Sequence, residues 1–452
     1  MAYTKACRNF WLAYANAIKE ALDFEPSGDT AIYIASKTQK GPFVSPRVPA
    51  DYTNSGIFEA CNNYLHPNSL FYDPTSKDSY IESLKDYLML VDIGAEDQVA
   101  VQIESYIKDL DHNLEIYGRL KEKALKTFRK HSDTGDTGDL TFLQWYHTNA
   151  LAFCNSSRDV DAALAALITS ANNVGSTLAQ RWAKDLRKLV FALKCEQQIP
   201  GITMDSNSAS AEQRQRMLIA VRSGRRLAAP KSSVCVPAYY CPLYQDVVPN
   251  WTDARSSDKP SDRMYIRYAE GEIAAEGDFG QTADQGEFDF TYTPWVSFNT
   301  AESEILLESD IADDSVDITI TFNDIRALAV SPGTWDVENP ESAYRRMKHA
   351  SKVPTQLVQP QAIIVIQNLS FRIGFRGVLV SEVSEKIDLI RTSGGFLRIL
   401  GVPVKIGGDS STDDTSHVGT WDNNNGVLEV LPTADGAFAT VVAMIGKPLY
   451  MN

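Results

Sequence analysis

The chain has 452 residues, of which 44% are hydrophobic, and its 43 Lys and Arg against 58 Asp and Glu give a formal net charge of −15. This composition is typical of a globular protein and excludes an intrinsically disordered chain. The acidic balance argues against a nucleic-acid-binding protein, which needs clustered basic residues. At this length we expect two domains rather than a single hydrophobic core.

The first 90 residues predict two helices separated by irregular structure. Apolar residues recur every three or four positions from Cys7 to Leu22, which indicates an amphipathic helix beginning near Thr4. This stretch lacks the continuous apolar core of a secretory signal, so we expect a cytoplasmic or other intracellular protein. Pro, Asn and Gly interrupt residues 25–76, which favours irregular structure there, with room for one short helix near residues 58–64. A capping-box pattern at residues 79–82 then predicts the start of the second helix.

The longest periodic pattern covers residues 98–132. Its apolar seam consists of Ile103, Ile107, Leu110, Leu114, Tyr117, Ala124 and Phe128. The spacings alternate between four and three except for a break at Lys121, where Leu120 is the alternative inward residue. A seam of this kind needs another helix packed along it. We therefore expect long antiparallel helices in the first half of the chain.

Residues 162–180 contain no charged side chain, although 22% of the chain is charged. Their apolar stripe continues in register beyond this segment, which predicts one helix that extends to about Lys194 and packs against the helix at residues 103–128. Several Asn, Gln, Ser and Thr side chains make the segment too polar for a resting membrane span. Two interpretations remain for its outer face. Neighbouring helices cover it, or it is a surface, including Leu167 and Leu178, that binds another copy or is released to a membrane.

A basic concentration follows a second capping-box pattern at Ser210 and Gln213, and Gly224 has the position of a helix C-terminal glycine. The basic residues of this stretch are Arg214, Arg216, Arg222, Arg225, Arg226 and Lys231. A solvated helix face followed by an interdomain linker is the favoured interpretation. The alternative is a site for an anion, a lipid headgroup or an acidic partner. In a self-associating protein, Arg214, Arg222, Arg225 and Arg226 would contact another copy.

From about Ser232 the hydrophobic period changes from 3.6 to 2, and runs rich in Val, Ile, Thr and aromatic residues alternate with turn residues. No helical crossovers separate most of these predicted strands, which indicates antiparallel pairing. Residues 380–395 fit either a long edge segment or one helix. The predicted fold class is α+β, with an N-terminal long-helix bundle (residues 1–228) followed by a C-terminal antiparallel β-sandwich or distorted barrel (residues 229–452).

The stretch from Tyr268 to Ile325 contains fifteen acidic residues and no Lys, Arg or His. A solvated acidic face on the β-rich domain is the favoured interpretation. Clustered carboxylates from loops also suit Ca²⁺, which takes six to eight oxygen ligands. The candidate ligands are Asp310, Asp313, Asp314 and Asp317, although their spacing matches no EF-hand. A third possibility is charge complementarity to the basic stretch of a neighbouring copy.

Catalytic motifs are absent from the sequence: there is no HExxH, GxSxG, phosphate-binding GxxxxGK or Rossmann glycine pattern. We therefore predict a non-enzymatic protein without a cofactor. A hydrolase would have to bring His147, His349 or His417 together with a carboxylate and a hydroxyl or thiol in an interdomain pocket.

The six cysteines are sparse and lack metal-ligand spacing, so reduced thiols are expected. Cross-links within an assembly are the alternative. Cys235 and Cys241 are the candidate pair for a disulfide within the chain.

These features together predict a structural protein that self-associates into an ordered intracellular body, with the chain itself as its partner and without nucleic acid. The observations behind this are the missing catalytic motifs, the uncharged helix surface and the separation of acidic from basic segments. The order of elements, long helices and then a β-rich module, resembles that of some bacterial helical pore-forming toxins in architecture only. That resemblance implies a membrane-active protein as the alternative function.

Overall fold

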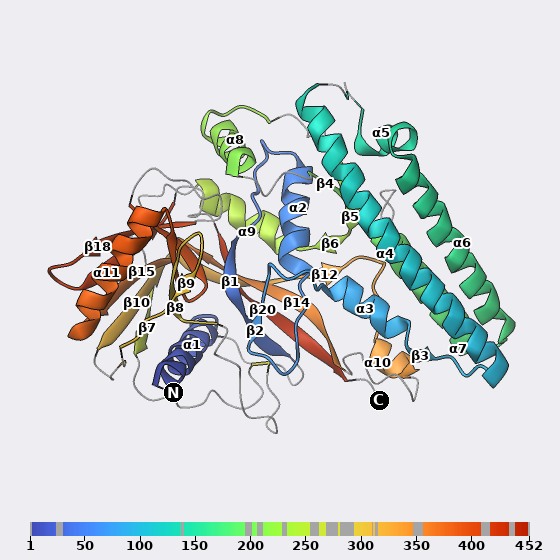
Figure 1. Ribbon diagram of the computed structural model, residues 1–452, viewed down its shortest axis with the longest axis horizontal. Coiled ribbons are helices and arrows are strands. Elements are labelled where there is room, and N and C mark those ends of the chain that lie inside the picture. Colours follow the sequence, from blue (N-terminus) through green and yellow to red (C-terminus); the bar gives the residue numbers. More distant parts are fainter. Residues whose placement is uncertain are drawn as a thin grey trace.

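The computed structural model (Figure 1) describes residues 2–23, 30–135, 137, 140–194, 201–205, 211–227, 233–253, 262–267, 279–280, 293–309, 311, 315–346, 356–407, 416–433 and 439–450. The helices are α1 (Ala2–Ala21), α2 (Ala50–Cys61), α3 (Tyr80–Leu88), α4 (Asp97–Asp133), α5 (Phe142–Asn149), α6 (Leu151–Asn173), α7 (Thr177–Lys194), α8 (Ala211–Arg222), α9 (Pro242–Asp253), α10 (Pro340–Ala343) and α11 (Val378–Ser393). The strands are β1 (Ala31–Lys40), β2 (Phe71–Tyr72), β3 (Val91–Asp92), β4 (Gly201–Asp205), β5 (Ser233–Pro237), β6 (Tyr239–Tyr240), β7 (Asp262–Arg267), β8 (Val296–Asn299), β9 (Glu304–Ile305), β10 (Val316–Phe322), β11 (Asp324–Ala329), β12 (Ser331–Pro332), β13 (Arg345–Arg346), β14 (Gln356–Gln367), β15 (Ser370–Phe375), β16 (Phe396–Ile399), β17 (Val402–Ile406), β18 (His417–Asp422), β19 (Val427–Pro432) and β20 (Thr440–Tyr450).

The long helices form one side of the molecule (Figure 1), as the apolar seam predicts. On α4, six of the seven seam residues are buried and Ile107 is partly buried against the same core. Helix α6 packs along α4, and its residues Leu164, Leu167 and Ala171 enter that core. Among the described residues, no helix has both the length and the apolarity needed to cross a membrane.

The prediction of one continuous helix up to Lys194 is wrong, because helix α6 ends at Asn173 and a separate helix, α7, begins at Thr177. Gly175 has a φ of +73°, a left-handed conformation that glycine adopts without a steric penalty. The Ser176 hydroxyl accepts a hydrogen bond from the Ala179 amide at 3.0 Å and starts the new helix. Helix α7 then folds back, so that Lys194 Nζ lies 2.7 Å from Asp161 Oδ1 on α6.

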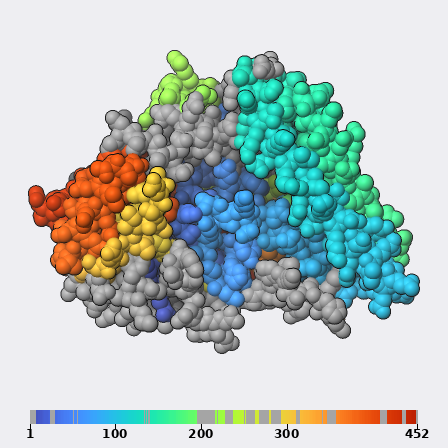
Figure 2. Space-filling view, viewed as in Figure 1, coloured from blue at the N-terminus to red at the C-terminus, as the bar shows by residue number. Residues whose placement is uncertain are grey.

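Residues predicted to be irregular contain β1, a strand of a five-stranded sheet with the order β11-β14-β20-β1-β2. Ile32 pairs with Ile445 and Ile34 with Ala443, so this N-terminal strand pairs antiparallel with the last strand of the chain. The division at residue 228 stays a prediction, but this sheet combines strands from both sides of it. In Figure 2, the N-terminal segments (blue) lie between α4 (cyan) and the C-terminal elements (orange).

The second large sheet has nine strands in the order β7-β10-β15-β19-β18-β17-β16-β8-β9, and all of its pairs are antiparallel except β17 with β18. Residues 380–395, which fitted either a long edge segment or one helix, are mostly helical and belong to α11. Helix α1, predicted correctly, shares a core with this sheet and with α11 rather than with the long helices α4, α6 and α7. Its Phe10 ring lies 4.3 Å from the Trp295 ring, and Trp11 Nε1 donates to the Thr293 carbonyl oxygen at 2.8 Å. The chain therefore combines a helical region with a curled antiparallel sheet.

Candidate functional site

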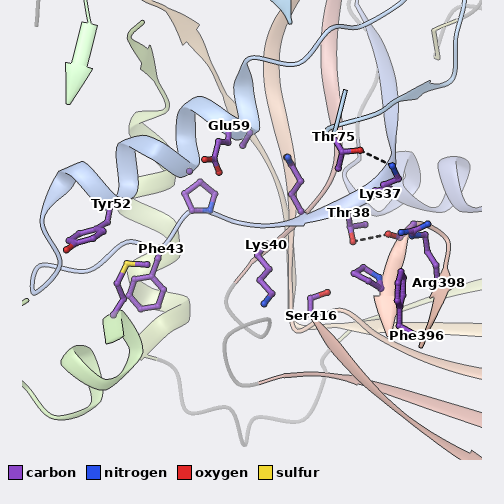
Figure 3. Close-up of a pocket in the computed structure, with 17 residues that line it drawn as sticks. Lys37, Thr38, Lys40, Phe43, Tyr52, Glu59, Thr75, Phe396, Arg398 and Ser416 are labelled. Carbon is purple, nitrogen blue, oxygen red and sulfur yellow. Dashed lines mark hydrogen bonds between the residues drawn. The ribbon is translucent and has the colours of Figure 1, made fainter. Parts of the chain in front are cut away.

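A cavity of about 510 Å³ lies where the end of β1 meets helix α2, helix α8 and the β16–β17 hairpin (Figure 3). Residues 37–40 of β1 all line it. The register between β1 and β20 shifts between Ile34 and Gln39, an irregularity of the kind that redirects side chains at functional sites. Further lining residues come from residues 42–75 and from Met217 on α8, and others come from more than 350 residues later in the chain, including Phe396, Arg398 and Ser416.

The floor of the cavity depends on a close approach between β1 and the β16–β17 turn. The Thr38 amide donates to the Gly401 carbonyl oxygen at 3.0 Å. Gly401 has a φ of +80°, and a Cβ built there would lie 2.9 Å from the Ser36 carbonyl oxygen. Both the backbone conformation and the contact therefore require glycine at this position.

Basic side chains lie on the β1 and β16 side of the cavity. Lys37 Nζ is 3.2 Å from Asp73 Oδ2 and donates to the Thr75 hydroxyl at 2.8 Å. Burial alone would raise the pKa of Asp73, but hydrogen bonds from Thr75 and Lys37 outweigh it and lower the pKa below its usual value. Lys37 is therefore held beside an ionised carboxylate. Lys40 and Arg398 also line the cavity, and the Arg398 guanidinium lies 5.3 Å from the centre of the Phe396 ring.

An apolar wall faces this basic side (Figure 3). Phe43, Tyr52 and Met217 belong to a small core cluster between α2 and α8, and each is buried. The Thr53 hydroxyl donates to the Phe43 carbonyl oxygen at 2.7 Å, and the Tyr244 hydroxyl donates to the Pro42 carbonyl oxygen at 2.6 Å. These bonds fix the backbone that carries the wall, so this side of the cavity is preformed.

Ser416 lines the cavity and forms a hydrogen-bonded chain with the residue that follows it. Its Oγ lies 2.8 Å from His417 Nδ1, and His417 Nε2 lies 2.8 Å from the Leu369 carbonyl oxygen. A carbonyl oxygen only accepts, so Nε2 carries the hydrogen and Nδ1 of the neutral ring accepts from the Ser416 hydroxyl. The Thr433 amide and hydroxyl both donate to the Ser416 carbonyl oxygen at 2.9 Å and hold its backbone in place.

The other histidines of the hydrolase hypothesis do not reach this cavity within the described part of the chain. His147 is exposed on α5, where its Nδ1 lies 3.5 Å from Cys154 Sγ. His349 lies outside the described residues. His417 is fully buried and meets a hydroxyl, but its second nitrogen contacts a carbonyl oxygen where the hypothesis expected a carboxylate.

The residues predicted for self-association are separated in the structure. Leu167 is 0% exposed in the core between helices, so it packs within the chain and is no surface residue. Leu178 is partly buried against the same core. Arg222, Arg225 and Arg226 are exposed at the end of α8. The side chain of Arg214 lies outside the described residues.

The predicted calcium ligands and disulfide are tested only in part. Asp310, Asp313 and Asp314 lie outside the described residues, and Asp317 on β10 is 3.8 Å from Arg376 Nη2. The described residues contain no group of three or more side chains that could bind a metal ion. Cys241 carries a free, buried thiol that contacts the Leu328 carbonyl oxygen, so it does not form the predicted disulfide with Cys235.

Sequence reasoning missed the whole cavity, because its basic residues lie in a segment interpreted as irregular and in one interpreted only as a strand. The apolar run at residues 31–35 was the available signal for β1. The residue pattern within one segment does not indicate which distant segment packs against it. Comparisons with protein-family models, with curated proteins and with solved structures found no match for this chain.

Proposed function

We propose that the cavity binds a small ligand with an anionic group and an apolar or aromatic body. The observation that carries this proposal is the composition of its described lining. Lys37, Lys40 and Arg398 line it with the carboxylate of Glu59. Outside the lining, Asp73 pairs with Lys37 at 3.2 Å and Glu304 lies 3.9 Å from Arg398. The cations lie on one side of the lining and the apolar side chains on the other, an arrangement that complements a ligand with one anionic end.

The size and the division of the lining fit this type of ligand. Small-molecule sites are typically 300–1,000 Å³, mostly apolar, with a few polar groups that set orientation. Here Phe43, which precedes α2, Tyr52 on α2 and Met217 on α8 would contact the ligand body. Lys40 with Arg398 would contact its charged group. Arg also binds carboxylate or phosphate through two parallel hydrogen bonds, which adds geometric selectivity.

A pair of dyes tests the charge requirement directly. 8-Anilinonaphthalene-1-sulfonate is anionic and aromatic, and N-phenyl-1-naphthylamine is its neutral analogue. We expect Lys40→Met to weaken binding of the anionic dye about tenfold, equivalent to about 1.4 kcal/mol, and to leave the neutral dye unchanged. Lys108→Met, on the exposed face of α4, is the matched control. Unchanged binding of the anionic dye to Lys40→Met would contradict the proposal.

Self-association through α8 is a second candidate function, and the exposed basic end of that helix favours it. Arg222, Arg225 and Arg226 are exposed, and Ile219, one turn earlier than Arg222, is 56% exposed. In a chain with a net charge of −15, the acidic surface of another copy is the complementary partner.

Sedimentation velocity at increasing salt tests this candidate. We expect oligomers at low salt that dissociate as salt screens the contact. Replacing Arg222, Arg225 and Arg226 with Glu should give a monomer. The control replaces Lys108, Arg119 and Lys123, which are exposed on α4, and so changes the net charge equally. A wild-type monomer at high concentration in low salt would exclude this function.

A further inference from the structure

The hydrogen-bonded chain at the edge of the cavity has the arrangement of an activated serine. We propose that Ser416 and His417 form a nucleophile and general base that hydrolyse an ester of the anionic ligand. This inference rests on the proposed ligand site, because the same cavity would hold the substrate. It adds an activity that the absence of sequence motifs argued against.

Three observations support the assignment of roles. Ser416 lines the cavity, and its hydroxyl donates to His417 Nδ1 over 2.8 Å, which is within the range for proton transfer from nucleophile to base. The Leu369 carbonyl oxygen accepts from Nε2 over 2.8 Å and so keeps Nδ1 unprotonated in the neutral ring. The third member of such a triad normally orients the histidine and stabilises its charged form, and here a carbonyl oxygen occupies that place.

The surroundings hold this pair in one geometry. His417 is 0% exposed and Ser416 is 3% exposed, and strand β18 begins at His417. The Phe371 ring packs edge-on against the imidazole, with 6.3 Å between ring centres. With the two hydrogen bonds from Thr433 to the Ser416 carbonyl oxygen, neither residue needs to be reoriented for reaction.

The reaction proceeds in two balanced steps. Ser416 Oγ bonds to the ester carbonyl carbon while its proton moves to His417 Nδ1. The carbon–oxygen bond to the alcohol then breaks, and Nδ1 returns the proton to the departing oxygen. In the second step water adds to the acyl-serine, gives a proton to Nδ1, and Ser416 Oγ leaves and recovers that proton. The products are a carboxylic acid and an alcohol, and no other reactant is consumed.

The basic side of the cavity defines the substrate class. Lys40 on β1 and Arg398 on β16 line the same cavity as Ser416 (Figure 3). An ester with a carboxylate or phosphate elsewhere in the molecule would place that charge near these cations. The apolar wall of Phe43, Tyr52 and Met217 would hold the remaining part.

Covalent labelling and turnover test the proposal on the full chain. A fluorophosphonate probe should modify Ser416, as located by mass spectrometry of peptides, and 4-nitrophenyl hemisuccinate should be hydrolysed faster than neutral 4-nitrophenyl acetate. Ser416→Ala should lose the label and lower hydrolysis by about 100-fold or more while still binding the anionic dye. Ser156→Ala is the control, because it removes a buried α6 serine whose hydroxyl donates to the Phe153 carbonyl oxygen on the same helix.

Each outcome separates the two proposals. If wild type binds the anionic dye through Lys40 but Ser416 takes up no probe, the hydrolase inference is wrong and the binding function stands. If Lys40→Met changes neither dye binding nor turnover, the ligand site is wrong. Label that appears equally in wild type and Ser416→Ala also overturns the assignment, because the reactive group is then another residue.

Discussion

The packing of α6 against α4 makes a quantitative prediction at Leu167. This side chain is 0% exposed, so Leu167→Ala removes three carbon atoms from a fully buried position. At about 0.8 kcal/mol per buried methylene group, the lost transfer free energy is about 2.4 kcal/mol. The cavity left behind brings the expected loss in unfolding free energy to about 3–5 kcal/mol.

Equilibrium urea unfolding measures this difference, and the same helix supplies a control. Leu151, at the start of α6, is 67% exposed, so Leu151→Ala should change the free energy of unfolding by less than about 0.5 kcal/mol. A loss below about 1 kcal/mol at Leu167 would refute the packing of α6 on α4. Leu167→Asp should destabilise further, because it buries a charge without a partner. If Leu167→Asp instead left the fold stable and abolished liposome leakage, the membrane-active alternative would be supported.

Other predictions concern backbone conformation, thiol reactivity and pH dependence. Gly175→Ala should lower the free energy of unfolding by about 1–2 kcal/mol, because φ is +73° there, whereas Gly118→Ala, in the middle of α4 with open space at its Cβ, should raise it by about 0.5–1 kcal/mol; thermal unfolding compares them. Burial raises the pKa of the Cys241 thiol to about 11, so iodoacetamide should modify the half-buried Cys154 first in native protein, and faster reaction at Cys241 would contradict its burial. Burial also raises the pKa of Asp336, so the folded state binds its proton more tightly than the unfolded chain does. Its contribution to stability is therefore complete below the usual carboxyl pKa of about 3.9 and is lost as pH rises through the folded pKa. Asp336→Asn should flatten that part of the stability profile, and an unchanged slope in urea unfolding would contradict this.

Hydrophobic periodicity correctly predicted the helices whose buried face is visible in the spacing of their own apolar residues. The seam on α4 and the apolar face of α1 are read directly from spacings of three and four, and both are buried. The α6–α7 break was missed because the apolar stripe continues past it unchanged. A single glycine, Gly175, turns the chain there, and its left-handed conformation leaves no trace in hydrophobic spacing.

Strand β1 shows a different limit. Its apolar run at residues 31–35 lies inside a longer segment interrupted by Pro, Asn and Gly. Those turn-forming residues led to the prediction of irregular structure instead of a strand. The partner that stabilises it, β20, lies about 400 residues later in the chain. Non-local pairing of this kind decides strand formation through tertiary contacts, which sequence patterns within one segment do not contain.

The candidate site follows from that pairing. β20 pairs with both ends of β1, at residues 31–34 and at Gln39 and Lys40. Between these paired ends, the Thr38 amide donates to the Gly401 carbonyl oxygen and joins the five-stranded sheet to the β16–β17 turn of the nine-stranded sheet. The cations and Ser416 then meet at a junction between two sheets, and each comes from an element that is also stabilised by its own sheet. The apolar wall opposite them belongs to the separate small cluster that contains Phe43, Tyr52 and Met217. Because the described lining residues are held by these contacts, binding of the proposed ligand would require little ordering of those residues.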